Sequence, residues 1–317
     1  MILDNNIDIE EQYLATVEDI LFFGTKKDDR TGVGTTSQFG HILKHDLSQG
    51  FPCLTTKKVL WQKAFDEMLW MISGSTNIND LPKRSQVIWK AWSDKDGNIG
   101  EGYGKQMRRW TSFYPRINAF IPKHINKILE DEIIEQEWEN IDFYKCLSDG
   151  GHICEFIKYE VDQIKKIQWQ LRNNPNDRRI VLNLWNVSEL EDMLLPPCHL
   201  LSIFNVQDGK LNCLLTLRSN DMFLGNPFNL CGYAMLVHLF AYCCDLEVGI
   251  LQVSIADAHI YNNHVEQIEE QLKRKPFKLP KFVIKEGAPK EITEIKIEHI
   301  DLIDYESNGM LKGAVAV

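Results

Sequence analysis

The chain has 317 residues, of which 44% are hydrophobic and 25% are charged, and its formal net charge is −10. These proportions are those of a globular protein, and the length allows one large domain or two average ones. The acidic balance argues against a face that binds nucleic acid, and no stretch reaches the roughly 18 unbroken apolar residues that a membrane span requires.

The N-terminal half is predicted to contain two helices separated by loops. Apolar residues recur at helical spacing over 13–23 and over 61–72, and Gly74 is a plausible stop for the second helix. A glycine- and threonine-rich loop covers 28–36, and a second glycine-rich loop covers 94–104.

Residues 111–157 are the least regular part of the chain. They are charged and helix-prone, with two adjacent glycines at 150–151. We interpret this segment as a helical insertion at about 111–157, packed on the outside of the core. Because the chain has no internal repeat or low-complexity stretch, we expect one domain over 1–317.

The C-terminal half combines helices with several strands. An amphipathic helix is predicted over 159–172, and the Asp-Gly dipeptide at 208–209 between the apolar runs 200–206 and 211–217 predicts a β-hairpin. A mostly apolar helix over 227–244 is expected to be buried. Further strands are expected at 179–185, 250–255, 277–285 and 291–297. A large sheet with helices and no βαβ repeat indicates an α+β fold.

The eight cysteines do not predict disulfides. Most lie in apolar runs such as 211–217 and 230–246, where cysteine usually behaves as a small buried hydrophobic residue. The acidic residues 1–11 lack the basic and apolar regions of a secretory signal. Because there is no Cys-x-x-Cys pair, a structural zinc site is not expected. We therefore expect a cytoplasmic protein without a metal.

Cys198 is the first candidate for chemistry. It follows two prolines and precedes His199, and the prolines fix the backbone so that the cysteine stands at the start of the next strand. A nucleophilic cysteine needs nearby cations, for which Arg178, Arg179 and Arg218 are candidates. A buried structural cysteine is the alternative, and the residues alone favour neither.

The segment from Arg218 to Asn229 gathers polar groups where a strand ends and a helix begins. Arg218 offers a planar fork suited to phosphate, and Ser219 adds a hydroxyl. Asp221 and Asn229 can read the donors and acceptors of a heterocycle. An ordinary capped loop is the alternative, and four such groups beside apolar walls make it the less favoured one.

Other positions carry weaker signals. Glu67 lies on an apolar helix, so it either reaches solvent or is buried with a raised pKa suited to proton transfer. His259 and Tyr261 follow a strand and can hydrogen-bond a sugar hydroxyl, although a structural histidine is the simpler interpretation. Arg30 and the pair at 178–179 would, alone, be interpreted as solvated basic residues.

Several segments, in order along the chain, carry a family resemblance. They are DRTGVGT (29–35), FPCLTTKKV (51–59), EMLWMISGSTN (67–77), IWKAW (88–92), GYGKQ (102–106), DRRIVLNLWN (177–186), LPPCH (195–199), RSNDMFLGNPFN (218–229), DAHIYNNH (257–264) and AVAV (314–317). Apart from 111–157, nearly the whole chain resembles the family of thymidylate synthases and pyrimidine-nucleotide hydroxymethylases.

The resemblance implies a fold and an activity. The implied fold has a large mixed β-sheet at the interface of a homodimer, covered by helices. The implied reaction is the methyltransferase reaction that converts dUMP to dTMP, in which 5,10-methylenetetrahydrofolate supplies the carbon and the hydride and leaves as dihydrofolate. Cys198 would add to C6 of the pyrimidine. Tyr103, through ordered water, would help remove the C5 proton, and Glu67 would anchor the water network at O4.

The resemblance also assigns the site residues. The implied catalytic set is Cys198, Glu67, Tyr103, Asp221, Arg218 and His199. The implied dUMP-binding set is Arg30, Arg178, Arg179, Arg218, Ser219, Asn229, His259 and Tyr261, with Arg178 and Arg179 reaching in from the other subunit. The implied folate-binding set is Lys57 for the glutamate tail, Ile88, Trp89, Trp92, Leu195, Asp221, Leu224, Gly225, Phe228, Ala316 and Val317. The Val317 carboxylate would close a lid that excludes water.

Some positions depart from the family pattern. Leu217 stands where glutamine is usual, and Met107 where tryptophan is usual. The other departures are Glu101-Gly102, Leu230-Cys231-Gly232, Ala256 and Gly313-Ala314. Because several of these flank the implied site, a dUMP hydroxymethyltransferase is the alternative, in which water captures the methylene and tetrahydrofolate is released.

Three retained features favour methylation of dUMP. They are Asn229, Trp89 and the terminal AVAV. An aspartate at 229 would suit a cytosine ring, whereas the tryptophan and the terminus help to keep water from the intermediate. A distant alternative is an inactive scaffold or RNA-binding relative. The net charge of −10 and the complete catalytic set argue against it.

Overall fold

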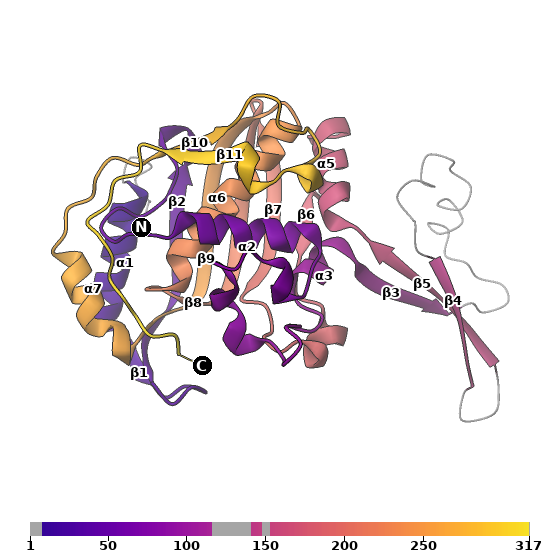
Figure 1. The fold of residues 1–317 in the computed structure, drawn as a ribbon, viewed down its shortest axis with the longest axis horizontal. Coiled ribbons are helices and arrows are strands. Elements are labelled where there is room, and N and C mark those ends of the chain that lie inside the picture. Colours follow the sequence, from indigo (N-terminus) through magenta and orange to yellow (C-terminus); the bar gives the residue numbers. More distant parts are fainter. Residues whose placement is uncertain (1–7, 116–140, 148–152, 317) are drawn as a thin grey trace.

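A six-stranded sheet in the order β1-β2-β9-β8-β7-β6 forms the centre of the fold (Figure 1). The computed structural model describes residues 8–115, 141–147 and 153–316. Neighbouring strands are antiparallel except β8 and β9, which are parallel. The strands of this sheet are β1 Thr25–Lys27, β2 Thr35–Asp46, β6 Val181–Asn183, β7 His199–Gln207, β8 Lys210–Asp221 and β9 Glu247–Tyr261. The predicted α+β class with a large mixed sheet is confirmed.

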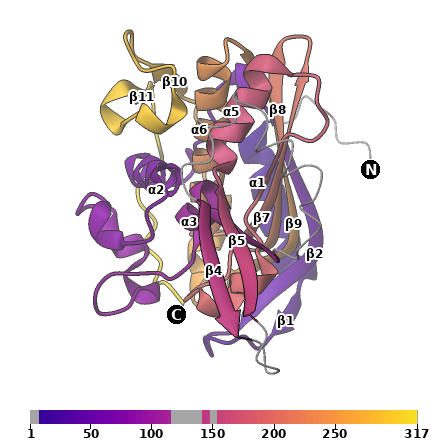
Figure 2. The ribbon, with the colours of Figure 1, turned by 90° about the vertical axis from the view of Figure 1, so that its right-hand side faces the viewer.

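The helices gather on one side of this sheet, as Figure 2 shows. The longest of the described helices, α6, connects the parallel strands β8 and β9, and Val237 and Phe240 on it are fully buried. This is a single βαβ unit rather than a repeat, and it confirms the prediction of a buried helix. The helices are α1 Ile9–Phe23, α2 Trp61–Ser73, α3 Tyr103–Arg108, α5 Gln163–Asn173, α6 Gly225–Cys243 and α7 Val265–Leu272.

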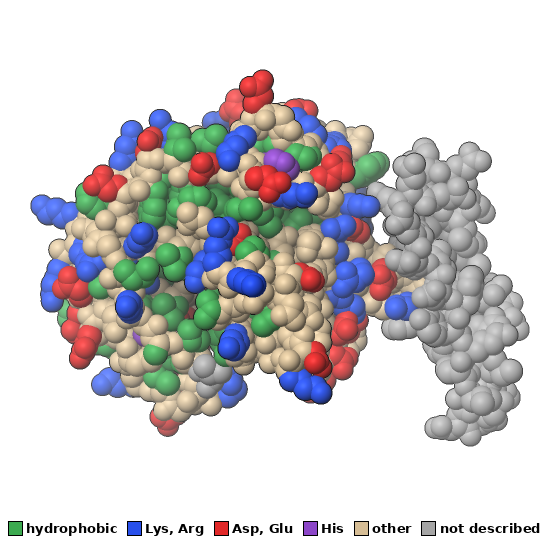
Figure 3. Space-filling view, viewed as in Figure 1, with side chains coloured by type: hydrophobic (Ala, Val, Ile, Leu, Met, Phe, Trp, Pro, Cys, Tyr) green, Lys and Arg blue, Asp and Glu red, His purple; other side chains and the backbone are tan. Residues whose placement is uncertain are grey.

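The other side of the sheet carries apolar side chains that this chain leaves exposed. On β2, Phe39 is 89% exposed and Ile42 is 44% exposed. Acidic and basic side chains are interspersed over the face shown in Figure 3, without a block of one sign. None of the described helices is both long and apolar enough to cross a membrane.

Two turns agree closely with the sequence. Asp208 and Gly209 have positive φ values of 50° and 74°, which is the geometry of the tight turn that joins β7 to β8. Gly74, with φ of 85°, ends α2 in the left-handed conformation that favours glycine. The predicted hairpin and the predicted helix stop are therefore confirmed.

The predicted helical insertion is wrong in the part that the structure describes. Here β3 Trp110–Pro115, β5 Ile153–Val161 and β4 Ile141–Leu147 form a separate antiparallel sheet in the order β3-β5-β4. The β-branched and aromatic residues of β3 and β5 favour strands over the helix that the charged composition suggested. Residues 116–140 and 148–152 of the predicted insertion lie outside the described residues.

Smaller corrections concern element boundaries. The helix predicted to begin at Tyr159 begins at Gln163, because the Asp162 side chain accepts the Lys165 N–H and caps it there. The loop predicted over 94–104 ends earlier, since Tyr103 begins α3.

The strand predicted at 291–297 is wrong. Ile292 and Ile295 are buried, and a spacing of three residues between buried positions suits the 3₁₀ turn that Ile292–Glu294 forms. The last strand pair lies instead at β10 Lys281–Ile284 and β11 Ile300–Ile303. Of the strand predicted at 277–285, residues 281–284, in its second half, are therefore β structure.

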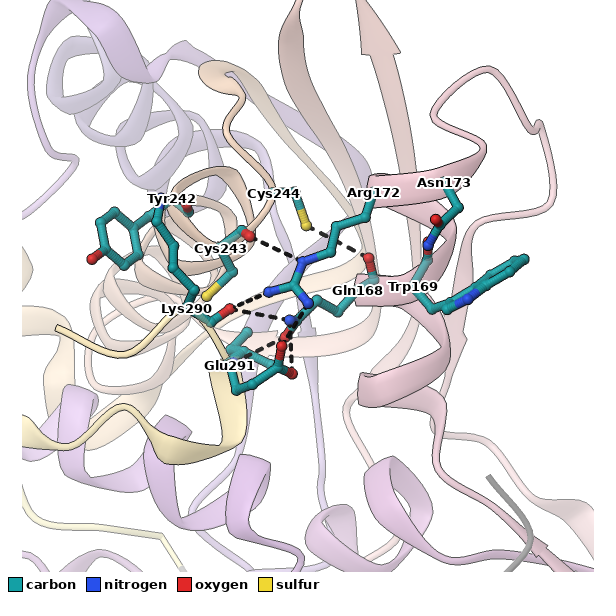
Figure 4. A network of polar contacts seen from close by, with 10 residues as sticks. Gln168, Trp169, Arg172, Asn173, Tyr242, Cys243, Cys244, Lys290 and Glu291 are labelled. Atoms are coloured by element: carbon teal, nitrogen blue, oxygen red, sulfur yellow. Dashed lines mark hydrogen bonds and ion pairs between the residues drawn. The ribbon is translucent and has the colours of Figure 1, made fainter. Parts of the chain in front are cut away.

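A polar network joins α5 to the end of α6 and to residues 290–292 (Figure 4). Arg172 donates to the Glu291 carboxylate at 2.5 Å and to the Cys243 carbonyl at 3.2 Å. Gln168 donates to Glu291 at 2.9 Å, and Lys290 donates to the Tyr242 carbonyl at 2.7 Å. Cations at the C-terminus of α6 complement its dipole. The network thus fixes α5, which leads into the loop carrying residues 178 and 179.

Candidate active site

Cys198 stands directly before β7, where the two preceding prolines place it. Its backbone N–H donates to the Tyr103 hydroxyl at 2.8 Å, and its carbonyl accepts the Arg218 N–H at 3.0 Å. The start of β7, the end of β8 and the start of α3 therefore meet at this residue. The sequence prediction that Cys198 stands at the mouth of a strand is confirmed.

The Arg218 guanidinium binds the backbone around the cysteine. It donates through Nε to the Pro197 carbonyl and through Nη2 to the Pro196 carbonyl, both at 2.8 Å. Burial raises the pKa of the Cys198 thiol, and the positive charge of Arg218 acts in the opposite direction. This second task of Arg218, beyond the predicted phosphate contact, has no signal in the spacing of the sequence.

Glu67, which lies on α2, is held by the indole of Trp89. Trp89 donates its Nε1–H to Glu67 Oε1 at 2.6 Å, and the Trp89 ring lies 5.6 Å from the Tyr103 ring. Burial raises the pKa of Glu67 to about 7, whereas the Trp89 hydrogen bond acts to lower it. A carboxyl group with this pKa can both release and accept a proton at neutral pH, as general acid–base catalysis requires.

The His199 ring lies between Tyr103 and Asn229. The His199 ring lies 5.1 Å from the Tyr103 ring, and its Nε2 is 2.8 Å from Asn229 Oδ1. Burial lowers the pKa of His199 to about 4, so the imidazole is neutral at neutral pH. Because Asn229 Oδ1 can only accept, Nε2 carries the hydrogen and the amide nitrogen of Asn229 is directed away from His199. This nitrogen lies close to Gly225, because a Cβ atom added to that glycine would be 4.0 Å from it.

Asp221 shapes the passage from β8 into α6. One carboxylate oxygen accepts the N–H groups of Phe223 at 2.9 Å and Leu224 at 3.3 Å. The carboxylate stays partly exposed, with 19% of its side chain accessible. The structure therefore leaves it able to meet a polar ligand group while it fixes the loop.

The predicted folate-binding side chains are mostly apolar and partly buried. Ile88, Trp92, Leu195, Leu224 and Phe228 all pack against the core while keeping part of their surface accessible. Trp89 and Ala316 are buried. Val317 lies outside the described residues.

Lys57, predicted to meet the glutamate tail, has a buried side chain. Its side chain is only 5% exposed, donates to the Phe223 carbonyl at 2.6 Å and lies 3.4 Å from the centre of the Phe223 ring. Burial lowers its pKa to about 7. The predicted tail contact would require this ammonium to leave its buried position.

The predicted phosphate-binding arginines lie on the surface. Arg30, Arg178 and Arg179 are exposed, and Arg179 pairs with Asp177 at 2.9 Å. Ser219 lies opposite Asp257 in the register of β8 and β9. The structure brings Arg218 to Cys198, but it does not bring residues 178 and 179 into contact with the cysteine of the same chain.

The predicted sugar-binding pair stands at the end of β9. The His259 and Tyr261 rings meet edge to face with centres 5.2 Å apart. His259 is buried, and burial raises the pKa of the half-buried Tyr261 to about 12. The Arg30 charge acts on Tyr261 as well, which places the loop of Arg30 near this end of the sheet.

Two supporting carboxylates were missed by the sequence reasoning. Glu10 accepts the N–H and hydroxyl groups of both Thr55 and Thr56, at 2.6–2.8 Å, and so fixes the turn that contains Lys57. Buried Asp66 receives two hydrogen bonds from Arg84 at 2.7 Å and 2.8 Å. The available signal was an acidic residue on an apolar helix face, which is rarely buried without partners.

A thiol beside an arginine, on a mixed sheet with helices on one side, is compatible with an enzyme that attacks its substrate through cysteine. A comparison with protein families identifies the family of this chain, because the family model described as thymidylate synthase matches residues 11–317. The chain belongs to the thymidylate synthase family. Membership implies dUMP and a folate as substrates, and an enzyme of methyltransferase type.

Proposed function

We propose that this protein is a thymidylate synthase in the strict sense, which methylates dUMP to dTMP. The observation that carries the proposal is the setting of Cys198. Its thiol lies beside Arg218, and its backbone is bonded to Tyr103, whose ring contacts the indole that holds Glu67. A nucleophile, a phenol and a carboxyl group of pKa about 7 thus occupy one connected site.

The proposed reaction uses these groups in order. The Cys198 thiolate adds to C6 of the pyrimidine, and the electron pair moves to C5. C5 then bonds to the methylene carbon of 5,10-methylenetetrahydrofolate while the bond between that carbon and N10 of the folate breaks and N10 takes a proton. The C5 proton leaves to solvent through water held near Tyr103. Elimination of the folate leaves an exocyclic methylene on C5. Hydride from the folate completes the methyl group, and the C6–sulfur bond breaks, giving dTMP and dihydrofolate.

Asn229 supports the choice of a uracil ring. Its oxygen is engaged by His199, and its amide nitrogen is a donor without a hydrogen-bond partner among the residues that the structure describes. A donor at this position suits the O4 carbonyl of uracil and opposes the exocyclic amine of cytosine. The apolar walls at Ile88, Trp92 and Leu195 suit the folate rings.

A homodimer is part of the proposal. Arg178 and Arg179 are exposed and stand apart from the Cys198 of their own chain, while Phe39 and Ile42 expose apolar surface on the open side of the sheet. Pairing two sheets would cover that surface and would bring the arginines to the partner's phosphate site. Mixing inactive Cys198→Ser with inactive Arg179→Ala subunits would then restore activity, whereas independent monomers would stay inactive.

The deciding experiment is incubation of the purified protein with dUMP and 5,10-methylenetetrahydrofolate. Dihydrofolate would be followed by its absorbance and the nucleotide identified by mass. Dihydrofolate together with dTMP supports the proposal. Tetrahydrofolate with 5-hydroxymethyl-dUMP and no rise in absorbance would show a dUMP hydroxymethyltransferase instead.

A further inference from the structure

Two loops carry the two partners of the hydrogen bond at the candidate nucleophile. Residues 98–102, the tyrosine loop, lead into α3, which begins at Tyr103. Residues 186–197, the cysteine loop, lead to Cys198, directly before β7. Because the Tyr103 hydroxyl accepts the Cys198 N–H at 2.8 Å, the geometry of this bond depends on how the two loops are held together.

Glu189 is a side chain of the cysteine loop that reaches α3. Its carboxylate accepts from the Lys105 ammonium and, at 2.6 Å, from the side-chain amide of Gln106. Only 14% of the Glu189 side chain is exposed, and Gln106 is fully buried. Because water screens these bonds little, they are stronger than those of an exposed ion pair. The Glu189 carboxylate thus ties the cysteine loop to the helix that begins at Tyr103.

Gln106 extends this link to both loops. Its Nε2 also donates to the Glu101 carbonyl of the tyrosine loop at 2.8 Å, and its Oε1 accepts from Asn186 of the cysteine loop at 3.3 Å. Its backbone carbonyl accepts from Gln163, on α5, at 2.7 Å. A helix of six residues such as α3 is not stable in isolation, so contacts of this kind determine where Tyr103 lies.

Glu101 also pairs with Lys105, at 2.5 Å, but this pair does not join the two loops. Glu101 precedes Lys105 by four residues, so the pair lies within the segment that carries Tyr103. The Glu101 side chain is 41% exposed, and an exposed pair contributes little. Glu101 and Glu189 therefore bring the same charge to the same ammonium, and of the two it is Glu189 that connects it to the cysteine loop.

We propose that Glu189 is a positioning residue that, through Lys105 and Gln106, holds the Tyr103 hydroxyl against the Cys198 N–H. The kinetic consequence rests on the proposed function, in which water near Tyr103 takes the C5 proton. If α3 loosens, the Tyr103 hydroxyl moves, while the backbone before Cys198 stays bound to Arg218. Loss of the Glu189 charge should therefore slow removal of the C5 proton more than addition of the thiol to C6.

The first test measures the hydrogen bond without any reaction. Pro196 and Pro197 have no amide hydrogen, so exchange of the Cys198 amide can be followed by mass spectrometry in a short peptide from ligand-free protein. Glu189→Gln is expected to raise this exchange rate roughly tenfold, the change that corresponds to about 1.4 kcal/mol. Glu101→Gln removes the same charge from beside Lys105 and is the matched control, with exchange at the unmodified rate. Equal exchange in Glu189→Gln and the unmodified protein would overturn the proposal.

The second test separates positioning from a general loss of structure. Tyr103→Phe removes the acceptor of the Cys198 N–H itself. Adding Glu189→Gln to Tyr103→Phe should therefore raise the exchange rate at Cys198 no further, because the two substitutions act on one bond. A further tenfold rise in the double variant would show that Glu189 acts on another part of the structure and would contradict the proposal.

The third test compares two chemical steps. Covalent complex formation with 5-fluoro-dUMP and the folate needs the thiol but no loss of a C5 proton, whereas tritium release from labelled dUMP needs that loss. Glu189→Gln should form the complex at close to the unmodified rate but release tritium roughly tenfold more slowly, and Glu101→Gln should match the unmodified protein in both assays. Equal slowing of both steps in Glu189→Gln would refute a role through Tyr103. An unmodified protein that releases no tritium would overturn the proposed function, and amide exchange at Cys198 would still decide the role of Glu189.

Discussion

Replacing Trp89 with phenylalanine tests the proposed role of Glu67. The substitution keeps an aromatic ring between Trp70, at 5.8 Å, and Tyr103, at 5.6 Å, but it removes the N–H that donates to Glu67 Oε1 at 2.6 Å. Burial would then raise the pKa of Glu67 without the opposing effect of the Trp89 hydrogen bond. The pKa of Glu67 should therefore rise above about 7.

The size of the shift follows from the lost hydrogen bond. A hydrogen bond to a charged group contributes about 1.5–3 kcal/mol. Because one pKa unit corresponds to about 1.4 kcal/mol, the pKa of Glu67 should rise by about 1 to 2 units. The ionised form then becomes scarce at neutral pH, so a step that needs the carboxylate slows there and recovers at higher pH.

The assay is the release of tritium from C5 of labelled dUMP, which both methylation and hydroxymethylation require. The acidic limb of kcat/KM against pH should move upward by about 1 to 2 units in Trp89→Phe. Trp92→Phe is the matched control, because the Trp92 ring lies 6.2 Å from the Trp89 ring while its own N–H has no partner in the described structure. An acidic limb that stays in place in Trp89→Phe, or that moves equally in Trp92→Phe, would refute the reasoning.

Three further predictions concern single contacts. Cys198→Ser should form no covalent complex with 5-fluoro-dUMP and the folate in denaturing mass spectrometry, and an adduct that persists would exclude Cys198 as the nucleophile. Lys57→Met should raise the free energy of unfolding in urea by about 2 kcal/mol at pH 7 and below, because the buried amine has its pKa lowered to about 7. Between pH 7 and 10.5, the pKa of lysine in the unfolded chain, the unfolded chain binds more protons than the folded protein, so the unmodified protein gains stability as the pH rises. The difference in unfolding free energy between Lys57→Met and the unmodified protein should therefore shrink over this range. A difference that grows with pH would contradict the prediction. Arg84→Met should lower the free energy of unfolding by about 2 kcal/mol, because it leaves the buried Asp66 carboxylate with fewer donors, and the loss should largely disappear in an Asp66→Asn background.

The sheet was predictable where one local rule dominated. The Asp-Gly turn at 208–209 fixed the hairpin, and the run from 227 to 244 is apolar on all sides, as a helix buried between α2 and the sheet requires. The insertion was not predictable in this way. Its charged composition favoured helix, while strand pairing between β3 and β5 depends on partners about 45 residues apart in the chain.

The sequence motifs predicted members of the candidate site but not the contacts between them. The motif at 195–199 located Cys198, yet nothing in the spacing indicated that Arg218 would bind the two proline carbonyls. The indole that holds Glu67 comes from 22 residues away, and Lys57 meets Phe223 from 166 residues away. Contacts of this kind form only after the elements pack, so a single sequence does not contain them as a pattern.

The geometry of Arg218 explains how one arginine can serve both the cysteine and a phosphate. A guanidinium has five N–H donors, and within the described part of the chain those toward Pro196 and Pro197 are the ones occupied. Donors therefore remain for a phosphate oxygen without releasing the backbone that positions Cys198. A phosphate, however, brings a charge of about −1.5 to −2, which would cancel the help that Arg218 gives to the thiolate. Further cations must offset that charge, and in the proposed dimer the exposed arginines at 30, 178 and 179 would supply them.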